Sequence, residues 1–286
     1  MARIVHISDP HFGTEQPAVQ AALAQQIAAL HADGVVLSGD ITQRARREQF
    51  RRAHDFMTQL SLPALVVPGN HDIPLFDLLA RCCWPYRNYR MLGNALAPHL
   101  CLGPVSVVGI NSAPRWRHKD GEIPLGDLKR QLEQHVEQTQ RTGSTPTLTV
   151  AVFHHPLDCR RRQDEPNLIH NAEAILATLS QYGVDLVLSG HIHDPLMRTS
   201  QHRYPSHHSP LVIALAGTCM SSRIRIGAPN SFNVIDFLGQ HEAAEVRITR
   251  MDWQADQRHF FEKEIASFCR DAEGWQELLP HVHLRG

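Results

Sequence analysis

The sequence predicts an α/β fold built around a mainly parallel β-sheet. Over the first two thirds of the 286-residue chain, short apolar runs alternate with amphipathic segments, as in strand–helix–strand units with right-handed crossovers. In the last third, further apolar runs follow one another with no long helical pattern between them. We therefore expect a parallel sheet from the first part and a second, antiparallel sheet packed against it.

Strands and helices alternate regularly at the start of the chain. Each predicted strand is a short apolar run, and Pro17 suits the first turn of the helix that begins there. The second helix carries its apolar residues at helical spacing on one face. In order, these elements are a strand at 3–8, a helix at 17–32, a strand at 35–38, a helix at 46–60 and a strand at 64–67.

The alternation continues as far as residue 189. We expect residues 75–89 to be helical with a break at Pro85, and Gly183 to end the helix that precedes it. The run 159–166 is charged and predicts a surface loop. The other predicted elements are strands at 105–110, 147–153 and 184–189, helices at 124–139 and 171–182, later strands at 211–216, 231–237 and 243–249, an edge strand at 258–262 and a helix at 272–279.

The composition indicates a globular protein without a general affinity for polyanions. Hydrophobic residues make up 42% of the chain, and the formal net charge of -1 gives no overall attraction to nucleic acid or an anionic membrane. The six cysteines form no Cys-x-x-Cys pair, so we expect reduced thiols in a cytoplasmic protein. No apolar run approaches the roughly 18 residues of a membrane span, so we expect none. The first predicted strand starts at residue 3, so we also expect no signal peptide.

Polar residues able to bind metal follow five of the predicted strands. The carboxyl ends of parallel strands share one edge of a sheet, so we expect these residues to meet there. A single histidine of this kind is most often a hydrogen-bonded loop or core residue, but five such clusters do not follow five strands by chance. The clusters are Asp9-Pro10-His11, Gly39-Asp40, Gly69-Asn70-His71-Asp72, His154-His155 and Gly190-His191-Ile192-His193.

The side chains of these clusters predict a site for two metal ions. Carboxylates and imidazoles without thiolates suit manganese or iron, with zinc or magnesium as alternatives. The ligands outnumber those that one ion needs, which indicates two ions about 3.5–4 Å apart. The glycines in three of the clusters allow close approach of the backbone to a crowded centre.

In this order, the blocks resemble the signature of the calcineurin-like metallophosphoesterase superfamily. All five blocks are complete and extend over residues 9–193. The resemblance implies a four-layer α/β/β/α sandwich of two mixed β-sheets, the metallophosphoesterase fold. We expect this domain to cover residues 1–250, with a C-terminal extension at 251–286 packed on the same domain.

The resemblance also implies a ligand set. It assigns Asp9, His11 and His193 to one metal, Asp40 to a bridge between the two metals, and Asn70, His154 and His191 to the second metal. His154 is chosen over His155 because the family ligand lies two residues before the proline, here Pro156.

Phosphoester hydrolysis is the activity that the resemblance implies. The two metals lower the pKa of a shared water, and the hydroxide attacks phosphorus in line with the leaving oxygen. His71 is the expected catalytic residue, which donates to a phosphate oxygen or to the leaving group. Asp72 either orients His71 or caps the turn. The arginines outside the blocks are expected to lie mainly on the surface, although Arg44 or Arg46 could reach an anionic substrate, and Arg160, Arg161, Arg162, Arg223 and Arg225 could steer it.

The opening Asp9-Pro10-His11-Phe12-Gly13 and the compact domain look most similar to bacterial class III cyclic nucleotide phosphodiesterases and related glycerophosphodiesterases. That resemblance implies a small phosphodiester substrate, although Pro10 replaces the small polar residue expected in the cyclic nucleotide enzymes. One alternative is a pyrophosphatase acting on a lipid-linked nucleotide diphosphate, with residues 75–102 as its apolar groove. A nuclease or a non-catalytic scaffold fits less well, because the charge is near neutral and no ligand is missing. A monomer and a homodimer both remain open.

Overall fold

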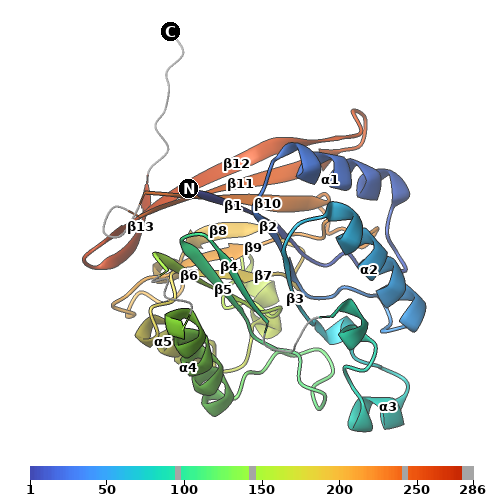
Figure 1. The fold of residues 1–286 in the computed structure, drawn as a ribbon, viewed down its shortest axis with the longest axis horizontal. Coiled ribbons are helices and arrows are strands. Elements are labelled where there is room, and N and C mark those ends of the chain that lie inside the picture. The colour runs from blue at the N-terminus through green and yellow to red at the C-terminus, as the bar shows by residue number, and fades with distance from the viewer. Residues whose placement is uncertain (94–97, 142–145, 240–243, 279–286) are drawn as a thin grey trace.

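The computed structural model describes residues 1–93, 98–141, 146–239 and 244–278. Two mixed β-sheets pack face to face, and helices cover the outer face of each sheet (Figure 1). This arrangement confirms the four-layer α/β/β/α sandwich. None of the helices in these ranges is both long and apolar enough to cross a bilayer.

The first sheet combines the N-terminal strands with the last strands of the chain. Its parallel part holds β1 (Ala2–Ile7), β2 (Gly34–Ser38) and β3 (Ala64–Val67), which are connected by α1 (Pro17–Ala29) and α2 (Arg47–Leu60). On the other side of β1 follow the antiparallel strands β10 (Ser231–Leu238), β11 (Glu245–Gln254), β12 (His259–Asp271) and β13 (Gly274–Leu278). The seven strands lie in the order β13-β12-β11-β10-β1-β2-β3.

The second sheet is formed by the middle of the chain. Its parallel strands are β5 (Val105–Gly109), β6 (Leu148–Val152), β7 (Leu186–Ser189) and β9 (Val212–Leu215). The helices α4 (Leu125–Arg141) and α5 (Ala172–Gln181) connect the first three of them. β4 (His99–Leu102) pairs antiparallel with β5, and β8 (Leu196–Thr199) pairs antiparallel with β9. The six strands lie in the order β4-β5-β6-β7-β9-β8.

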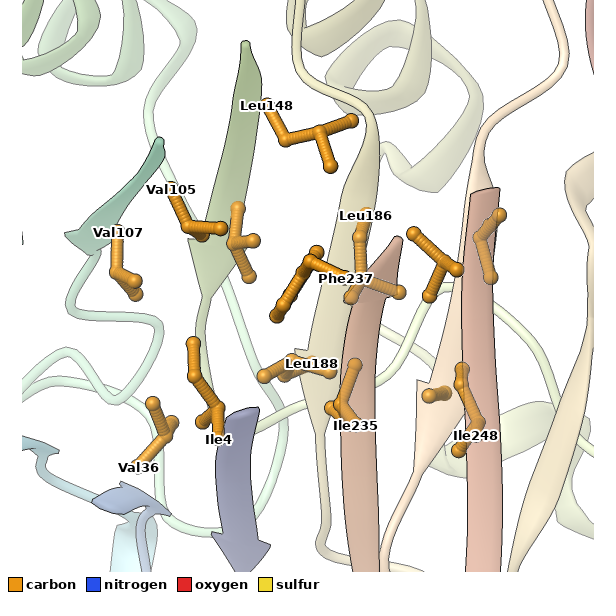
Figure 2. Packing of buried hydrophobic residues seen from close by; sticks show 14 of the residues in the cluster. Ile4, Val36, Val105, Val107, Leu148, Leu186, Leu188, Ile235, Phe237 and Ile248 are labelled. Carbon is orange, nitrogen blue, oxygen red and sulfur yellow. The ribbon is translucent and has the colours of Figure 1, made fainter. Parts of the chain in front are cut away.

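Successive side chains along a strand point to opposite faces of its sheet, so they pack either between the two sheets or against the helices. In β1, Ile4 points between the two sheets, whereas Val5 packs with residues of α1 and α2. Figure 2 shows the layer between the sheets, where Ile4 and Ile235 from the first sheet approach Leu188 from the second. These strands are buried on both faces, which explains why they read as continuous apolar runs.

The sheet assignment predicted from the sequence is wrong in two respects. The five strands that end in polar clusters do not share one parallel sheet, because β1, β2 and β3 lie in the first sheet, whereas β6 and β7 lie in the second. The last third of the chain does not form a separate sheet, since β10 to β13 extend the first sheet beyond β1. Apolar patterning identifies a strand but carries no information about its partner.

Several local predictions also need correction. The helix expected at 272–279 is the strand β13 up to Leu278, and residue 279 lies outside the described residues. The edge strand expected at 258–262 is the long interior strand β12. The helix expected at 75–89 shortens to α3 (Leu78–Cys83), and β4 and β8 were not predicted.

The loop expected at the surface at 159–166 is partly buried. Cys159 and Asp164 are buried, and a 3-10 turn, η3 (Arg162–Asn167), ends the segment. Two of its charged residues form ion pairs with residues outside the segment, Asp164 with Arg225 at 2.8 Å and Arg161 with Asp194 at 3.1 Å. A run of charged residues in the sequence does not show whether the side chains face solvent or pair with opposite charges elsewhere in the folded protein.

Candidate metal centre

Loops from both sheets bring all the predicted ligands to one place. They leave the carboxyl ends of β1, β2 and β3 in the first sheet and of β6 and β7 in the second. Two groups of side chains could each hold a metal ion with ligand atoms within 4.8 Å of one another: Asp9, His11 and His193, and Asp9, Asp40 and His154. A third such group contains His154, His155 and His191.

The first group is compact and fixed in its ring orientation. His193 Nε2 lies 3.0 Å from Asp9 Oδ1 and 3.2 Å from His11 Nε2. His193 Nδ1 lies 2.8 Å from the carbonyl oxygen of Arg223. Because a carbonyl oxygen can only accept, Nδ1 donates to it, and Nε2 faces Asp9 and His11. A histidine held in this way through Nδ1 can bind a metal through Nε2.

His154 is held in the same way on the opposite side of Asp40. Its Nδ1 donates to the carbonyl oxygen of Ser38 at 2.8 Å, so Nε2 is directed at the cluster. That Nε2 lies 3.3 Å from Asp40 Oδ1 and 3.3 Å from His191 Nδ1. The other oxygen, Asp40 Oδ2, lies 3.8 Å from His11 Nε2. Asp40 therefore presents one carboxylate oxygen to each side of the site.

The side chain of Asn70 bears on whether a cation fits at this cluster of side chains. Its amide oxygen Oδ1 is buried and has no hydrogen-bond partner among the described residues. An unsatisfied buried oxygen is costly, and nearly all such groups in folded proteins have a partner. A metal ion beside Asn70 would supply that partner, so the residues present fit the group that the signature implies.

The rings of His154 and His155 are held in different ways. The ring of His155 is hydrogen-bonded at both nitrogens, with Nδ1 2.9 Å from Ser112 Oγ and Nε2 3.0 Å from the carbonyl oxygen of Lys119. Ser112 Oγ also accepts from the backbone N–H groups of His154 and His155 at 3.1 Å each. His155 thus holds the loop in place while His154 faces the cluster.

The backbone at the cluster is unusual. Ten residues other than glycine have positive φ in the described chain, and five of them are predicted ligands: Asp9, His11, Asp40, His191 and His193. This left-handed region is unfavourable for residues with a Cβ atom, and such strain gathers at functional sites. Tight turns at the strand ends therefore aim these side chains inward.

Glycines allow the loops to approach one another. A Cβ atom on Gly69 would lie 2.2 Å from Asp40 Oδ1, and one on Gly190 would lie 1.9 Å from Ser8 Oγ. Both distances are far below van der Waals contact. Only glycine fits at these two positions, as the sequence pattern predicted.

Charges within the cluster favour metal binding. Burial lowers the pKa of His11 and of His191 to about 3, so both imidazoles are neutral. Burial opposes ionisation of Asp9 and Asp40, but the neighbouring histidines hold the pKa of both carboxyls below the usual range. Burial would lower the pKa of His154, yet the charge of Asp40 brings it to about 9. The site therefore attracts positive charge, whether a proton or a metal ion.

A buried chain of hydroxyl groups supports Asp9 from behind. Ser8 Oγ donates to Asp9 Oδ2 at 2.6 Å, and Ser38 Oγ donates to Ser8 Oγ at 2.8 Å. His6 Nε2 lies 2.9 Å from Ser38 Oγ and closes the chain. Such outer contacts fix the direction of a ligand, and sequence reasoning missed them because serines and a histidine inside a strand carry no distinctive pattern.

His71 lies at the edge of the cluster, and its ring is not held by Asp72. His71 Nδ1 is 3.0 Å from the carbonyl oxygen of Gln43. The Asp72 carboxylate instead accepts from the backbone N–H groups of Gly69, Ile41 and Thr42 at 2.8–3.0 Å. Of the two roles considered for Asp72, the geometry supports capping of the loops.

The structure places two of the arginines that were considered for substrate binding. Arg223 is exposed, as expected, and its Nη1 lies 3.2 Å from His71 Nε2. Arg44, expected to be able to reach a substrate, lies over the ring of Phe76 at 5.4 Å and lines a cavity of about 510 Å³ with Trp84 and Arg87. The sequence analysis named Arg223 only as one of several arginines that could steer a substrate, because it lies outside every signature block.

Comparison with known proteins identifies the family. The sequence model of the calcineurin-like phosphoesterases matches residues 2–195. The chain belongs to this family. The resemblance recognised in the five blocks is thereby confirmed, and it applies to most of the residues that form the cluster.

Two curated relatives of this phosphoesterase are phosphodiesterases by name. Glycerophosphodiester phosphodiesterase GpdQ of Enterobacter lignolyticus is 27% identical over 212 residues, which cover 68% of this chain and 72% of the relative. A probable cyclic nucleotide phosphodiesterase of Synechococcus is 27% identical over 168 residues, which cover 58% and 60%. These are the two kinds of enzyme that the opening block resembles.

Solved structures confirm the fold of this phosphoesterase. A purple acid phosphatase from yellow lupin superposes with a TM-score of 0.65 at 13% identity, over 95% of this chain and 54% of that one. A dimetal phosphatase from Danio rerio superposes with a TM-score of 0.57 at 15% identity, over 93% and 98%. At these identities the likeness is one of fold.

Proposed function

We propose that this phosphoesterase is a binuclear metalloenzyme that hydrolyses a small phosphodiester of the cyclic nucleotide or glycerophosphodiester type. The observation that carries the proposal is the position of Asp40. Its two oxygens face His154 at 3.3 Å and His11 at 3.8 Å, one on each side of the cluster. A carboxylate between two sets of imidazoles suits a bridge between two metal ions.

The proposed ligand set follows from the two groups around Asp40. Asp9, His11 and His193 would hold one metal, and Asn70, His154 and His191 would hold the other, with Asp40 shared. When bound, the two metals supply Lewis acidity for the phosphate oxygens and lower the pKa of a water molecule toward neutrality. Manganese and iron suit these oxygen and nitrogen donors, with zinc or magnesium as alternatives.

The residues of the chain itself would position the phosphate and handle a proton. In its imidazolium form, His71 would donate the Nε2 proton to a phosphate oxygen or to the leaving group and become a neutral imidazole, with the Nδ1 proton kept on the Gln43 carbonyl oxygen. Asp72 would keep the loops of Asp40 and Asn70 at a fixed separation through its three backbone contacts. An alkoxide leaves poorly without a proton, so a diester depends on a donor such as His71.

One observation favours a second substrate class, a lipid-linked nucleotide diphosphate. The segment around α3 exposes large apolar side chains: Phe76 (80% exposed), Leu78 (70%), Leu79 (68%) and Trp84 (59%). These residues lie close in the chain to His71, and Phe76 and Trp84 line the 510 Å³ cavity with Arg44 and Arg87. An apolar patch with cations at its rim suits an amphipathic anionic substrate.

The proposed enzyme is one domain that includes the C-terminal extension. In support of this, β12 and β13 continue the first sheet, and Trp275 of β13 is buried and donates from Nε1 to Asp185, the residue before β7 of the second sheet, at 3.0 Å. A segment that joins both sheets by packing and hydrogen bonding belongs to the same core.

Metal analysis followed by a turnover screen tests the function. We expect about two metal ions per chain after reconstitution with Mn²⁺, and hydrolysis of cyclic nucleotides or glycerophosphodiesters at a higher kcat/KM than of nucleotide diphosphate derivatives. A preference for the diphosphate derivatives would favour the second substrate class. One metal per chain, or hydrolysis of none of these esters, would contradict the proposal.

A further inference from the structure

We propose that Arg223 binds a non-bridging phosphate oxygen of the substrate and sets how well the site accepts a dianionic phosphate group. The inference rests on the proposed function, because it assigns a specificity residue to the same site. Arg223 comes from the segment between β9 and β10, and it follows the last signature block by 30 residues.

The guanidinium of Arg223 reaches the cluster from its own loop. Nη1 lies 3.1 Å from Gln43 Oε1, 3.2 Å from His71 Nε2 and 3.5 Å from both ring nitrogens of His11. Its backbone is anchored independently of the side chain, since its carbonyl oxygen accepts from His193 Nδ1 at 2.8 Å. A substitution of the side chain leaves this backbone contact, and with it the orientation of His193, in place.

The charge of Arg223 is not matched by a carboxylate. Among the described residues, no carboxylate oxygen forms an ion pair with its guanidinium within 4.0 Å. The arginines nearby are paired: Arg225 with Asp164 at 2.8 Å, and Arg161 with Asp194 at 3.1 Å. An exposed cation that faces a cluster of metal ligands without a counter-ion is suited to bind an anion there.

The donors of Arg223 are also available. Its hydrogen bonds to described side chains all use Nη1, which leaves Nη2 and Nε for a ligand. A guanidinium with two free N–H directions can bind two oxygens of a phosphate in parallel, as a lysine ammonium cannot. Arg223 and His71 approach each other from different loops, so they would face the same phosphate group.

This position predicts a difference between substrates. A monoester carries about two negative charges at neutral pH, because the second pKa of a phosphate ester is about 6, whereas a diester carries one. The attraction between a guanidinium and a phosphate grows with the charge of the phosphate. Loss of Arg223 should therefore lower monoester turnover more than diester turnover.

The test compares Arg223→Gln and Arg223→Lys with wild type after reconstitution with Mn²⁺. Arg51→Gln, which removes an equal charge from the exposed surface of α2, is the matched control. We expect Arg223→Gln to keep its metal content and to bind inorganic phosphate about 10–100-fold more weakly in calorimetry, the range for a lost charge-assisted hydrogen bond. The kcat/KM for p-nitrophenyl phosphate should fall more than that for bis-(p-nitrophenyl) phosphate.

Arg223→Lys should restore part of the phosphate affinity, and Arg51→Gln should match wild type. Unchanged phosphate binding in Arg223→Gln, equal losses for both esters, or loss of metal would overturn the assignment. The calorimetric result does not depend on turnover. If wild type binds phosphate through Arg223 but hydrolyses neither ester, the proposed function fails and the assignment of Arg223 stands.

Discussion

Oδ1 of Asp40 lies 3.3 Å from Nε2 of His154, and this contact joins the two β-sheets at the candidate metal centre. Asp40 follows β2 in the first sheet, whereas His154 follows β6 in the second. The charge of the Asp40 carboxylate outweighs the effect of burial on His154 and raises the pKa of this histidine to about 9. A site assembled across two sheets depends on the way in which the sheets pack together.

Replacement of Asp40 should remove the metals. We expect Asp40→Ala to lose both metal ions and nearly all phosphoesterase activity, because each ion would lose a shared carboxylate oxygen. Elemental analysis of the purified variant measures this directly, with circular dichroism to verify the fold. Asp55→Ala on the exposed surface of α2 is the control and should bind metal as wild type does. Two ions at full occupancy in Asp40→Ala would rule out the bridging role.

Replacement of His71 should separate metal binding from turnover. His71 Nδ1 is bound to the Gln43 carbonyl oxygen, and the residue stands at the edge of the metal-ligand groups. We expect His71→Ala to retain its metals and to lower kcat by about 10²–10⁴-fold, the usual effect of losing an acid–base group. His54→Ala, a change at an exposed histidine of α2, should leave kcat unchanged. Loss of metal together with rate would show that His71 is a ligand.

Phosphodiesters should be hydrolysed faster than phosphomonoesters. Among the described residues, Arg223 is the arginine or lysine whose side chain makes hydrogen-bond contacts with imidazoles of the cluster, at 3.2–3.5 Å. A monoester carries about one more negative charge than a diester at neutral pH, and a single exposed guanidinium neutralises only part of that additional charge. The measurement compares kcat/KM for bis-(p-nitrophenyl) phosphate and p-nitrophenyl phosphate with Mn²⁺ at matched pH. A higher value for the monoester would exclude the diesterase assignment.

A histidine far from the metal centre should make stability depend on pH. His135 of α4 is buried, with Nδ1 2.8 Å from His99 Nδ1 and Nε2 2.9 Å from Ser106 Oγ. Burial, and secondly the charge of His99, lowers the pKa of His135 to about 4. Between about pH 6.5 and about pH 4, His135 is protonated in the unfolded chain but neutral in the folded protein. Protonation therefore favours the unfolded state, and the free energy of unfolding falls as the pH is lowered through this range.

We expect His135→Gln to remove that loss. Its free energy of unfolding, measured in urea at pH 7.5, 6 and 5, should fall less steeply than that of wild type, by about 1 kcal/mol per pH unit. His118→Gln is the control, because His118 is exposed, and its curve should run parallel to wild type. Parallel curves for wild type and His135→Gln would show that His135 titrates normally in the folded protein.

A buried carboxylate in the loop after β6 should be important for stability. Asp158 is fully buried and pairs with Arg198 Nε at 2.7 Å and Arg203 Nε at 2.8 Å. Asp158→Ala would leave both guanidiniums without their main partner, so we expect it to destabilise the protein by about 3–5 kcal/mol, the range for a broken buried pair. Thermal or urea unfolding measures this loss.

The matched change is Asp127→Ala, which removes a carboxylate paired with Arg130 on the exposed surface of α4. Exposed pairs of this kind contribute little, so its unfolding curve should lie close to that of wild type. Equal effects of Asp127→Ala and Asp158→Ala would contradict the structural role given to Asp158.

The residues of the candidate site could be named from the sequence because each block is a local pattern. Each ligand block follows a strand directly, and a run such as Asn70-His71-Asp72 after β3 identifies its own position at a strand end. Gly69 and Gly190 mark close approaches that only glycine permits. The helices α1, α2, α4 and α5 were also predicted within a few residues, because apolar periodicity is a property of a single segment.

The tertiary structure alone decided which strands are partners and which distant residues meet. Backbone hydrogen bonding is the same for every strand, so nothing in the apolar run of β10 shows that it pairs with β1 and not with another strand. The same holds for Arg223. The sequence shows only that it is charged, whereas the loop after β9 places its Nη1 3.2 Å from His71 Nε2. Local sequence determines what a residue can do chemically, whereas the packing of the whole chain determines which residues it meets.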